Sequence, residues 1–331
     1  MNSAQRPTAP LFAPVAATRL ANPGYARMFA PGRLTLGVFF PIEAFAGDTP
    51  QMNGQVELAQ RAEAAGFAAL WFRDVPLRVP AFGDTGQVFD PWVWMAYIGA
   101  LTAHIALATG AIVLPLRHPL HVAKASASID RLTGGRLVMG VASGDRPQEF
   151  SAFAVDPSHL GDSFRERFAA IRSVQLESFP DASDHWGWTS AMDVVPKPYA
   201  DGVPLLVTGR SRQDLDWIAA HADGWITYPR AVVLQHRQVE AWRHAVERAH
   251  PGAFRPFAQS LYIDLARDPG AEPVPIHLGW RLGREPLRRL LAQLRASGVN
   301  HVALNLKYGE RPAPEVLEEI ARHVLPEFAS P

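Results

Sequence analysis

Short runs of apolar residues alternate along the chain with longer segments in which apolar residues recur every three or four positions. Short runs of this kind are typical of strands that are buried on both faces. They lie at residues 34–41, 68–72, 105–114, 137–142, 204–208, 224–228, 257–265 and 299–306. The pattern therefore predicts about eight parallel strands with helices between them.

The segments between these runs carry the start signals and the periodicity of helices. Asp90 precedes Pro91 and His118 precedes Pro119, so that a capping residue stands before a proline at the first helical position. Further helices are predicted at 58–65, 164–171, 215–218, 232–250 and 286–294, where apolar residues share one helical face.

This alternation predicts the α/β class, and eight parallel strands predict closure into a (β/α)8 TIM barrel. An open, doubly wound sheet is the alternative, but the glycines of 140–144 lack the Gly-x-Gly-x-x-Gly spacing of a dinucleotide site. One barrel domain accounts for the length, and we place it at 34–331, with long insertions after strands at 181–200 and 266–285.

Residues 1–33 form a separate N-terminal arm in this prediction. They are rich in alanine and proline, contain no acidic residue and include no apolar stretch long enough for the core of a signal peptide. We expect a surface arm anchored by Tyr25, Met28 and Phe29, with a targeting peptide as the less favoured alternative. No stretch reaches the roughly 20 apolar residues of a membrane span, and we expect a cytoplasmic protein.

Composition excludes several classes of partner and chemistry. Lys and Arg together number 32, as do Asp and Glu, so that no overall field attracts nucleic acid or an anionic membrane surface. The chain has no cysteine, which removes disulfides, thiolate metal sites and a cysteine nucleophile. The expected partner is a small-molecule substrate, bound at a local site.

Working residues of a barrel lie at the carboxyl ends of its strands and in the loops that follow. The loops that stand out are Arg73-Asp74, Thr109-Gly110-Ala111, Ala142-Ser143-Gly144-Asp145-Arg146 and Thr208-Gly209-Arg210-Ser211-Arg212. In the last loop, small residues expose backbone N–H groups at the expected start of a helix, beside two arginines, as in phosphate sites. The alternative is an ordinary strand-to-helix turn capped by Ser211. Trp225 and Tyr228 suit either core packing or stacking on a ring.

Other candidate centres are weaker. His118 and His121 are three residues apart and His104 lies nearby, but no carboxylate stands at a companion spacing, so we expect no metal site. Glu318-Glu319 is interpreted as a solvated helix face rather than an acid/base pair. The chain has no Gly-x-Ser-x-Gly motif, which disfavours a serine esterase; a metal-dependent hydrolase is a minor alternative.

Several motifs follow one another in order along the chain. They are Ala108-Thr-Gly-Ala-Ile-Val-Leu-Pro, His118-Pro, Ala123-Lys124, Asp130-Arg-Leu-Thr-Gly-Gly-Arg136, Gly140-Val-Ala-Ser-Gly, Thr208-Gly-Arg-Ser211, Ala222-Asp-Gly-Trp225 and Gly298-Val-Asn-His-Val302, with Gly66-Phe67 and Leu70-Trp71 before them. The set resembles the bacterial luciferase superfamily, the luciferase-like flavin- or deazaflavin-dependent oxidoreductases, over residues 34 to about 308.

The resemblance implies a cofactor site. An isoalloxazine-type ring would lie over the end of the third strand at Gly110-Ala111, where the family often has a non-proline cis peptide. Ser143-Gly144 and the 208–212 loop match positions that hold the cofactor phosphate. Thr109 and Trp225 complete the candidate cofactor-binding set.

The implied activity is the oxidation of a small organic substrate with reduced flavin and O2, and FMN is the preferred cofactor. A coenzyme F420-dependent hydride transfer in the same pocket is the alternative, and a barrel that binds flavin without catalysis is a further one. On resemblance alone we also expect a homodimer and a separate flavin reductase.

One departure from the family pattern lies after the second strand. The luciferase site uses a histidine there, whereas this chain has Arg73-Asp74-Val75-Pro76, so light emission is not expected. Asp74 matches an acidic position of the family, and Arg73 could bind an anionic substrate, which makes both candidate catalytic residues. A salt bridge between the two is the alternative.

Overall fold

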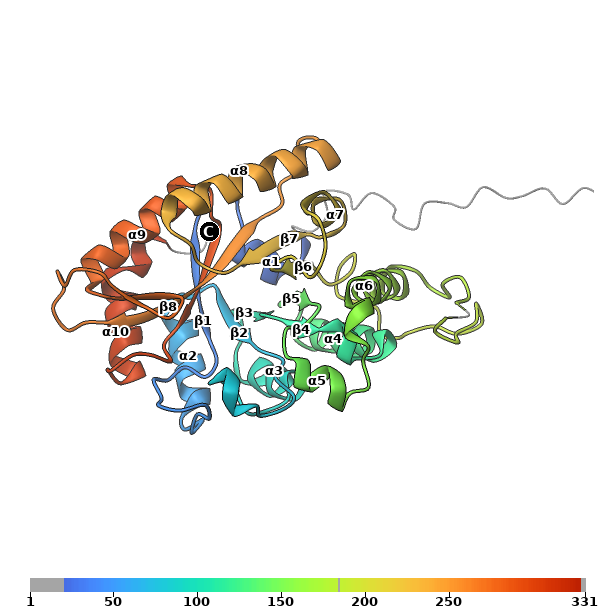
Figure 1. The fold of residues 1–331 in the computed structure, drawn as a ribbon, viewed down its shortest axis with the longest axis horizontal. Helices are drawn as coiled ribbons and strands as arrows, with labels where there is room; N and C mark the ends of the chain where they lie inside the picture. Colours follow the sequence, from blue (N-terminus) through green and yellow to red (C-terminus); the bar gives the residue numbers. More distant parts are fainter. Residues whose placement is uncertain (1–20, 184, 329–331) are drawn as a thin grey trace, which may run out of the picture.

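The strands of the computed structural model, which describes residues 21–183 and 185–328, close into a parallel barrel (Figure 1). The barrel has eight strands, because β11 pairs with both β8 and β1. In order they are β1 (Thr35–Phe39), β2 (Ala69–Phe72), β3 (Ala106–Thr109), β5 (Leu137–Ala142), β6 (Leu205–Thr208), β7 (Gly224–Thr227), β8 (Phe257–Leu265) and β11 (His301–Asn305). The predicted TIM barrel is confirmed.

The third strand is interrupted. The predicted run at 105–114 divides into β3 and a short β4 (Ile112–Val113), and both pair with β5. Between them the Gly110–Ala111 peptide bond is cis, at the position that the family resemblance implied. The chain therefore changes direction at the carboxyl end of β3, where the candidate site lies.

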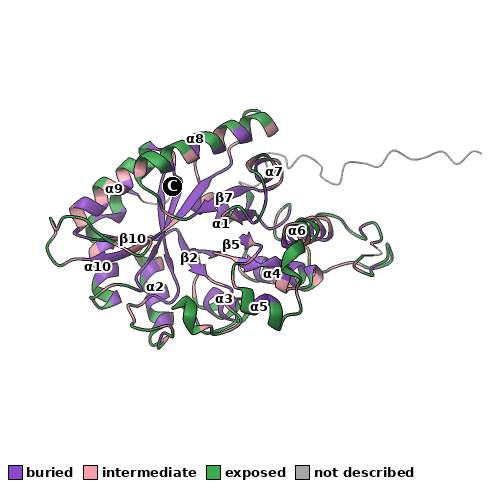
Figure 2. Ribbon diagram, viewed as in Figure 1, coloured by how far each residue is buried: buried purple, intermediate pink, exposed green. Residues whose placement is uncertain are grey.

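Helices surround the barrel and turn their buried faces toward it (Figure 2). They are α2 (Gln55–Ala65), α3 (Pro91–Leu101), α4 (Pro119–Leu132), α5 (Pro147–Ala152), α6 (Leu160–Leu176), α7 (Leu215–His221), α8 (Val232–Ala249), α9 (Arg284–Ala296) and α10 (Ala313–His323). Asp90 and His118 cap α3 and α4 as predicted, since each side chain accepts a hydrogen bond from a first-turn amide. The expected helix start at Ser211 is wrong: α7 begins at Leu215, and its N-cap is Asp214.

The segment before the first strand enters the barrel instead of lying on its surface. Tyr25, Met28 and Phe29, the predicted anchors, are at most 2% exposed and belong to the apolar cluster inside the barrel. Tyr25 and Met28 belong to the short helix α1 (Pro23–Met28), and Phe29 is its C-cap. Tyr25 Oη donates a hydrogen bond of 3.0 Å to the Asp223 carbonyl. Residues 22–29 thus fill the amino end of the barrel, which differs from the expected surface position, whereas residues 1–20 of the predicted arm lie outside the described residues.

Next to the 22–29 segment, the buried His301 of β11 links β1, β2 and α1 through hydrogen bonds. His301 is fully buried; Trp71 Nε1 donates to its Nε2 over 2.9 Å, and its Nδ1 lies 2.7 Å from Thr35 Oγ1. The Thr35 hydroxyl donates to the Met28 carbonyl of α1. These contacts are satisfied together when the imidazole is neutral and carries its proton on Nδ1.

Both predicted insertions are present, and the second adds a hairpin to the barrel. Strands β9 (Val274–Ile276) and β10 (Gly279–Leu282) are antiparallel to each other, and β10 pairs in parallel with the outer half of β8. The first insertion crosses the outside of α4 and α6 in an irregular path that includes a bridge between Ser183 and Trp188.

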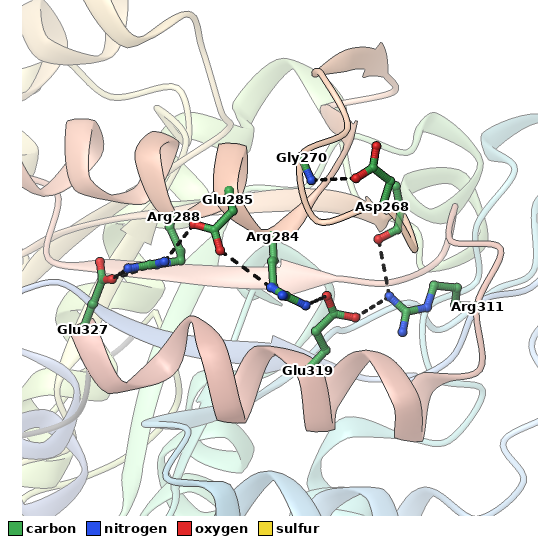
Figure 3. A network of polar contacts seen from close by, with 9 residues as sticks. Asp268, Gly270, Arg284, Glu285, Arg288, Arg311, Glu319 and Glu327 are labelled. Carbon is green, nitrogen blue, oxygen red and sulfur yellow. Dashed lines mark hydrogen bonds and ion pairs between the residues drawn. The ribbon is translucent and has the colours of Figure 1, made fainter.

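Ion pairs connect the helices that follow this hairpin (Figure 3). Glu319 of α10 accepts hydrogen bonds from Arg284 (3.1 Å) and Arg311 (2.6 Å), and its side chain is only 12% exposed. Glu318 is 65% exposed and pairs with Arg322. The interpretation of Glu318-Glu319 as a solvated face is therefore right for Glu318 and wrong for Glu319, which joins α9 to α10.

The His301 contacts predict how stability depends on pH. Desolvation lowers the pKa of His301 to about 3, whereas an unfolded histidine titrates near its usual 6.5. Below that pH the unfolded chain binds a proton at this histidine and the folded chain does not. The free energy of unfolding therefore falls by about 1.4 kcal/mol for each unit by which the pH decreases. His301→Gln removes this contribution. We expect the difference in unfolding free energy between wild type and variant to shrink by about 2 kcal/mol from pH 7.5 to pH 5 in urea titrations.

The matched control is exposed His104→Asn, for which the difference from wild type should stay constant over the same pH range. A constant difference for His301→Gln as well would show that His301 does not resist protonation.

Candidate functional site

A cavity of about 300 Å³ opens at the carboxyl end of the barrel and brings together the four loops that the sequence singled out. Its lining includes the predicted residues Arg73, Asp74, Gly110, Ala111, Ser143, Gly144, Thr208, Gly209, Arg210 and Ser211. These positions come from β2, β3, β5 and β6, four neighbouring strands of the barrel. Their convergence follows from the parallel sheet, in which all carboxyl ends meet at one rim.

A larger and more open cavity of about 600 Å³ lies between the loops that follow β1 and β11. Its charged groups are largely paired: Glu57 accepts from Arg61 at 2.7 Å, and Glu310 accepts from Arg281 at 2.7 Å. It contains none of the four loops. We therefore place the site in the smaller cavity, where several buried donors have no acceptor.

The 208–212 loop offers backbone donors, but fewer than expected. The Gly209 amide already donates to the Ile226 carbonyl over 2.8 Å, and the Ser211 hydroxyl donates to the Thr208 carbonyl over 2.9 Å. Within residues 21–183 and 185–328, the amides of 210–212 donate to no protein atom. Since α7 begins only at Leu215, any anion here would be held by loop amides rather than by the end of a helix.

Two buried side-chain donors reinforce this loop. Thr208 Oγ1 and Arg146 Nη1 are buried without a hydrogen-bond partner in the described part of the chain, and both residues line the cavity. The other end of the Arg146 guanidinium donates to the Asp84 carbonyl over 2.9 Å. A buried donor without an acceptor costs about 1–3 kcal/mol. The donor set is therefore suited to an anionic group with several oxygen atoms, such as a phosphate.

The wall of the cavity at the interrupted strand is tightly packed. A Cβ atom on Gly110 would lie 3.1 Å from Trp71 Cε3 and 3.2 Å from Phe39 Cε1, so only glycine leaves this surface undisturbed. Ala111 follows it in the lining. This arrangement fits the expected support for a planar ring.

Arg73 and Asp74 do not pair with each other. Arg73 donates to Asp84 through both terminal nitrogens, at 2.7 and 3.1 Å. Arg117 donates to Asp74 through Nε, at 2.9 Å, and through one terminal nitrogen, at 2.7 Å. Burial opposes charge on Arg73, but the Asp84 carboxylate outweighs it and raises the pKa of Arg73 above its ordinary value. Asp74 Oδ2 also accepts the amide of Val113 in β4, so this residue fixes the strand beyond the cis peptide.

Three predicted cofactor residues lie outside the cavity lining. Thr109 is fully buried and donates to the Gly140 carbonyl at 2.8 Å, and Arg212 is exposed beyond the lining. Trp225 is 1% exposed and packs against Trp242 and Phe257, which is the core-packing alternative. Its Nε1 donates to the Gly209 carbonyl at 2.5 Å, and Arg210 lies 5.3 Å from its ring. Trp225 therefore positions the loop from behind.

A second, smaller cavity of about 120 Å³ adjoins the first at the centre of the barrel mouth. The two share Arg73, Gly110, Thr208 and Tyr228. Phe39, Ile226, Thr227, Ser260, Tyr262 and Asn305 complete the smaller one, which we call the mouth cavity.

Residues that the sequence did not single out as candidates include Arg146, Asp84, Arg117 and Tyr262. Arg146 belongs to one of the four candidate loops, and its positive charge close to Ser143-Gly144 is the signal that could have identified it. Asp84 and Arg117 gave none, because their partners lie 11 and 43 residues away in the chain.

Among the described residues, no group of three or more histidine and carboxylate side chains could hold a metal ion. His118 caps α4, and its ring centre lies 6.1 Å from that of His121. In the same part of the chain, no helix has the length and apolar character needed to cross a bilayer.

The family model for luciferase-like monooxygenases matches residues 34–268, which is well over half of the chain. The chain belongs to this family.

An uncharacterized protein of Mycobacterium tuberculosis, Rv0953c, is 32% identical over 197 residues, covering 53% of this chain and 67% of its own. The alkanal monooxygenase alpha chain of Photorhabdus luminescens is 26% identical (52% and 47%), and an F420-dependent hydroxymycolic acid dehydrogenase of M. tuberculosis is 28% identical (61% and 55%). The match thus spans about half the length of these two characterised relatives.

Solved structures support the same fold at low sequence identity. The monooxygenase RslO1 of Streptomyces bottropensis superposes with a TM-score of 0.73 and 19% identity, covering 89% of this chain and 100% of that one. An F420-dependent secondary alcohol dehydrogenase, solved with an F420-acetone adduct, gives 0.72 and 16%, covering 88% and 98%. Both kinds of enzyme share the barrel, so the fold leaves the cofactor open.

Because the buried Thr208 hydroxyl has no hydrogen-bond partner among the described residues, we expect it to destabilise the cofactor-free protein. Thr208→Val replaces the hydroxyl with a methyl group of similar shape. We expect the free energy of unfolding of the cofactor-free protein to rise by about 1 kcal/mol, measured by urea denaturation.

Thr227→Val is the control, because Thr227 is a nearby and more deeply buried threonine whose hydroxyl does have partners, the Tyr228 carbonyl and Gln235, both at 3.2 Å. That variant should be destabilised. A lower free energy of unfolding in Thr208→Val would mean that Thr208 Oγ1 already has a hydrogen-bond partner in the cofactor-free protein and is not available to a ligand.

Proposed function

We propose that this protein is a flavin-dependent oxidoreductase, a monooxygenase that uses reduced FMN and O2 on a small organic substrate. The observation that carries the proposal is the cavity at the end of β3. It combines a tightly packed wall at Gly110-Ala111 with donors at Thr208, Arg146 and the 210–212 amides that have no partner among the described residues. Membership of the luciferase-like monooxygenase family supports the reaction class.

These residues divide the work of holding FMN. Thr208, Arg146, Arg210 and the loop amides would bind the phosphate, and the surface at Gly110-Ala111 would support the ring. When bound, reduced FMN would supply the electrons that place one oxygen atom of O2 in the substrate and release the other as water. The buried apolar side chains of Phe39 and Ile226 in the mouth cavity would help to keep water from this reaction.

A second candidate is hydride transfer with coenzyme F420. It is favoured by the similarity to the hydroxymycolic acid dehydrogenase and to the secondary alcohol dehydrogenase fold. Parallel titrations of the purified protein with FMN and F420, followed by fluorescence, distinguish the two. Product formation from reduced FMN, O2 and a panel of substrates separates a monooxygenase from a barrel that binds flavin without catalysis. A separate flavin reductase remains part of the proposal.

The phosphate assignment is tested at Arg210, which lines the cavity and is exposed. Arg210→Ala should weaken cofactor binding by about tenfold, the usual loss for one charge-assisted hydrogen bond, without a change in thermal unfolding. Arg212→Ala is the control, since Arg212 is two residues away but outside the lining; it should cost less than about threefold. Equal losses in both variants would place the phosphate elsewhere.

We further propose a homodimer that uses α3. The outward face of this helix carries Val93, Ala96, Tyr97, Ala100 and Leu101, without a single charged side chain. Val93 is 69% and Tyr97 54% exposed. An apolar stripe of this kind facing water marks an interaction surface, and a second copy would present the same uncharged stripe across a twofold axis.

Val93→Glu combined with Tyr97→Glu should therefore convert the dimer to a monomer in light-scattering measurements. Val233→Glu with Leu234→Glu on α8, where the apolar side chains are 66% and 51% exposed, is the matched control and should leave the mass unchanged. A wild-type monomer would contradict the dimer itself.

A further inference from the structure

The only charged side chain in the lining of the mouth cavity, within the described residues, is Arg73. This charge is already matched. Asp84 grips both terminal nitrogens from behind, and the two side chains are 14% and 12% exposed, so that the pair is largely withdrawn from solvent. An anion entering the mouth would have to compete with the Asp84 carboxylate for the terminal nitrogens of Arg73, both of which are already bonded, and this leaves little net gain.

The pair is also held rigidly. Gln87 accepts the Arg73 amide at 3.0 Å and donates to the Arg73 carbonyl at 2.5 Å, and the Gly86 amide donates to Asp84 at 2.9 Å. The Arg73 guanidinium is therefore not free to swing away from Asp84 toward a substrate carboxylate.

Hydrogen-bond donors nevertheless remain in the mouth. Arg73 Nε is buried and has no partner among the described residues. Burial raises the pKa of Tyr262 to about 12, so its phenol keeps a proton to donate. The lining also includes the polar side chains of Ser260 and Asn305, and it contains no carboxylate, lysine or histidine in the described chain.

We propose that the substrate is an uncharged molecule with a carbonyl group or a similar oxygen acceptor, selected in the mouth cavity by the Arg73–Asp84 pair. The acceptor oxygen faces Arg73 and Tyr262, and the apolar part of the substrate packs on Phe39 and Ile226. This refines the proposed function and rests on it for the identity of the site. It replaces the sequence-based expectation that Arg73 binds an anionic substrate.

The test compares two probes of the same shape that differ in charge, acetophenone and benzoate. Their affinities are measured by titration calorimetry on protein loaded with oxidised cofactor, where no turnover occurs, and on cofactor-free protein. Wild type should bind acetophenone at least about tenfold more tightly than benzoate. Asp84→Asn keeps the shape of the pair but leaves the Arg73 charge unmatched, and it should shift the ratio about tenfold or more toward benzoate.

Two further variants complete the design. Asp156→Asn changes the net charge equally at a surface site where the side chain is 64% exposed, and it should leave the ratio within about twofold. The double variant Arg73→Gln with Asp84→Asn removes both charges, and it should bind benzoate no better than acetophenone even if Asp84→Asn alone is too unstable to titrate.

The proposal is overturned if wild type prefers benzoate, if it binds neither probe, or if Asp84→Asn shifts the ratio no more than Asp156→Asn does. Cofactor affinity is measured separately beforehand. If neither FMN nor F420 binds, the proposed function fails, while the probe ratio on cofactor-free protein still decides the selectivity of the mouth.

Discussion

The barrel interior depends on one buried imidazole. His301 accepts from Trp71 and contacts Thr35, which in turn donates to Met28, so a single neutral ring joins the strands β2, β1 and β11 to the helix below them. Trp71 also lies directly beneath Gly110. The position of Trp71, and with it the cavity wall at Gly110, therefore depends on hydrogen bonds that extend to the amino end of the barrel. Apolar packing alone would not specify this position.

The site combines two different electrostatic arrangements side by side. In the 300 Å³ cavity, Thr208, Arg146 and the amides of 210–212 have donors without a protein acceptor among the described residues, as binding of an anion requires. In the mouth cavity, the positive charge of Arg73 is balanced by its ion pair with Asp84. Groups that titrate near neutral pH are absent from the described lining of the mouth, which agrees with chemistry that resides in a bound cofactor rather than in an acid/base pair.

Local signals in the sequence predicted most of the fold, and tertiary contacts account for the misses. Apolar runs located the strands, and Asp90 marked a helix start because capping depends only on neighbouring residues. The partners of Arg73 and the burial of the 22–29 segment could not be predicted, since they arise from loops and ends that meet only after closure. For the candidate site, the four loops do meet in one cavity. Trp225, in contrast, faces the core, because alternation along one strand cannot say which side faces the cavity.

Because α1 packs into the amino end of the barrel, apolar side chains close that end among the described residues, and the two cavities lie at the opposite, carboxyl end. A substitution in α1 would therefore loosen the packing below the site without changing any group that a ligand in these cavities could contact.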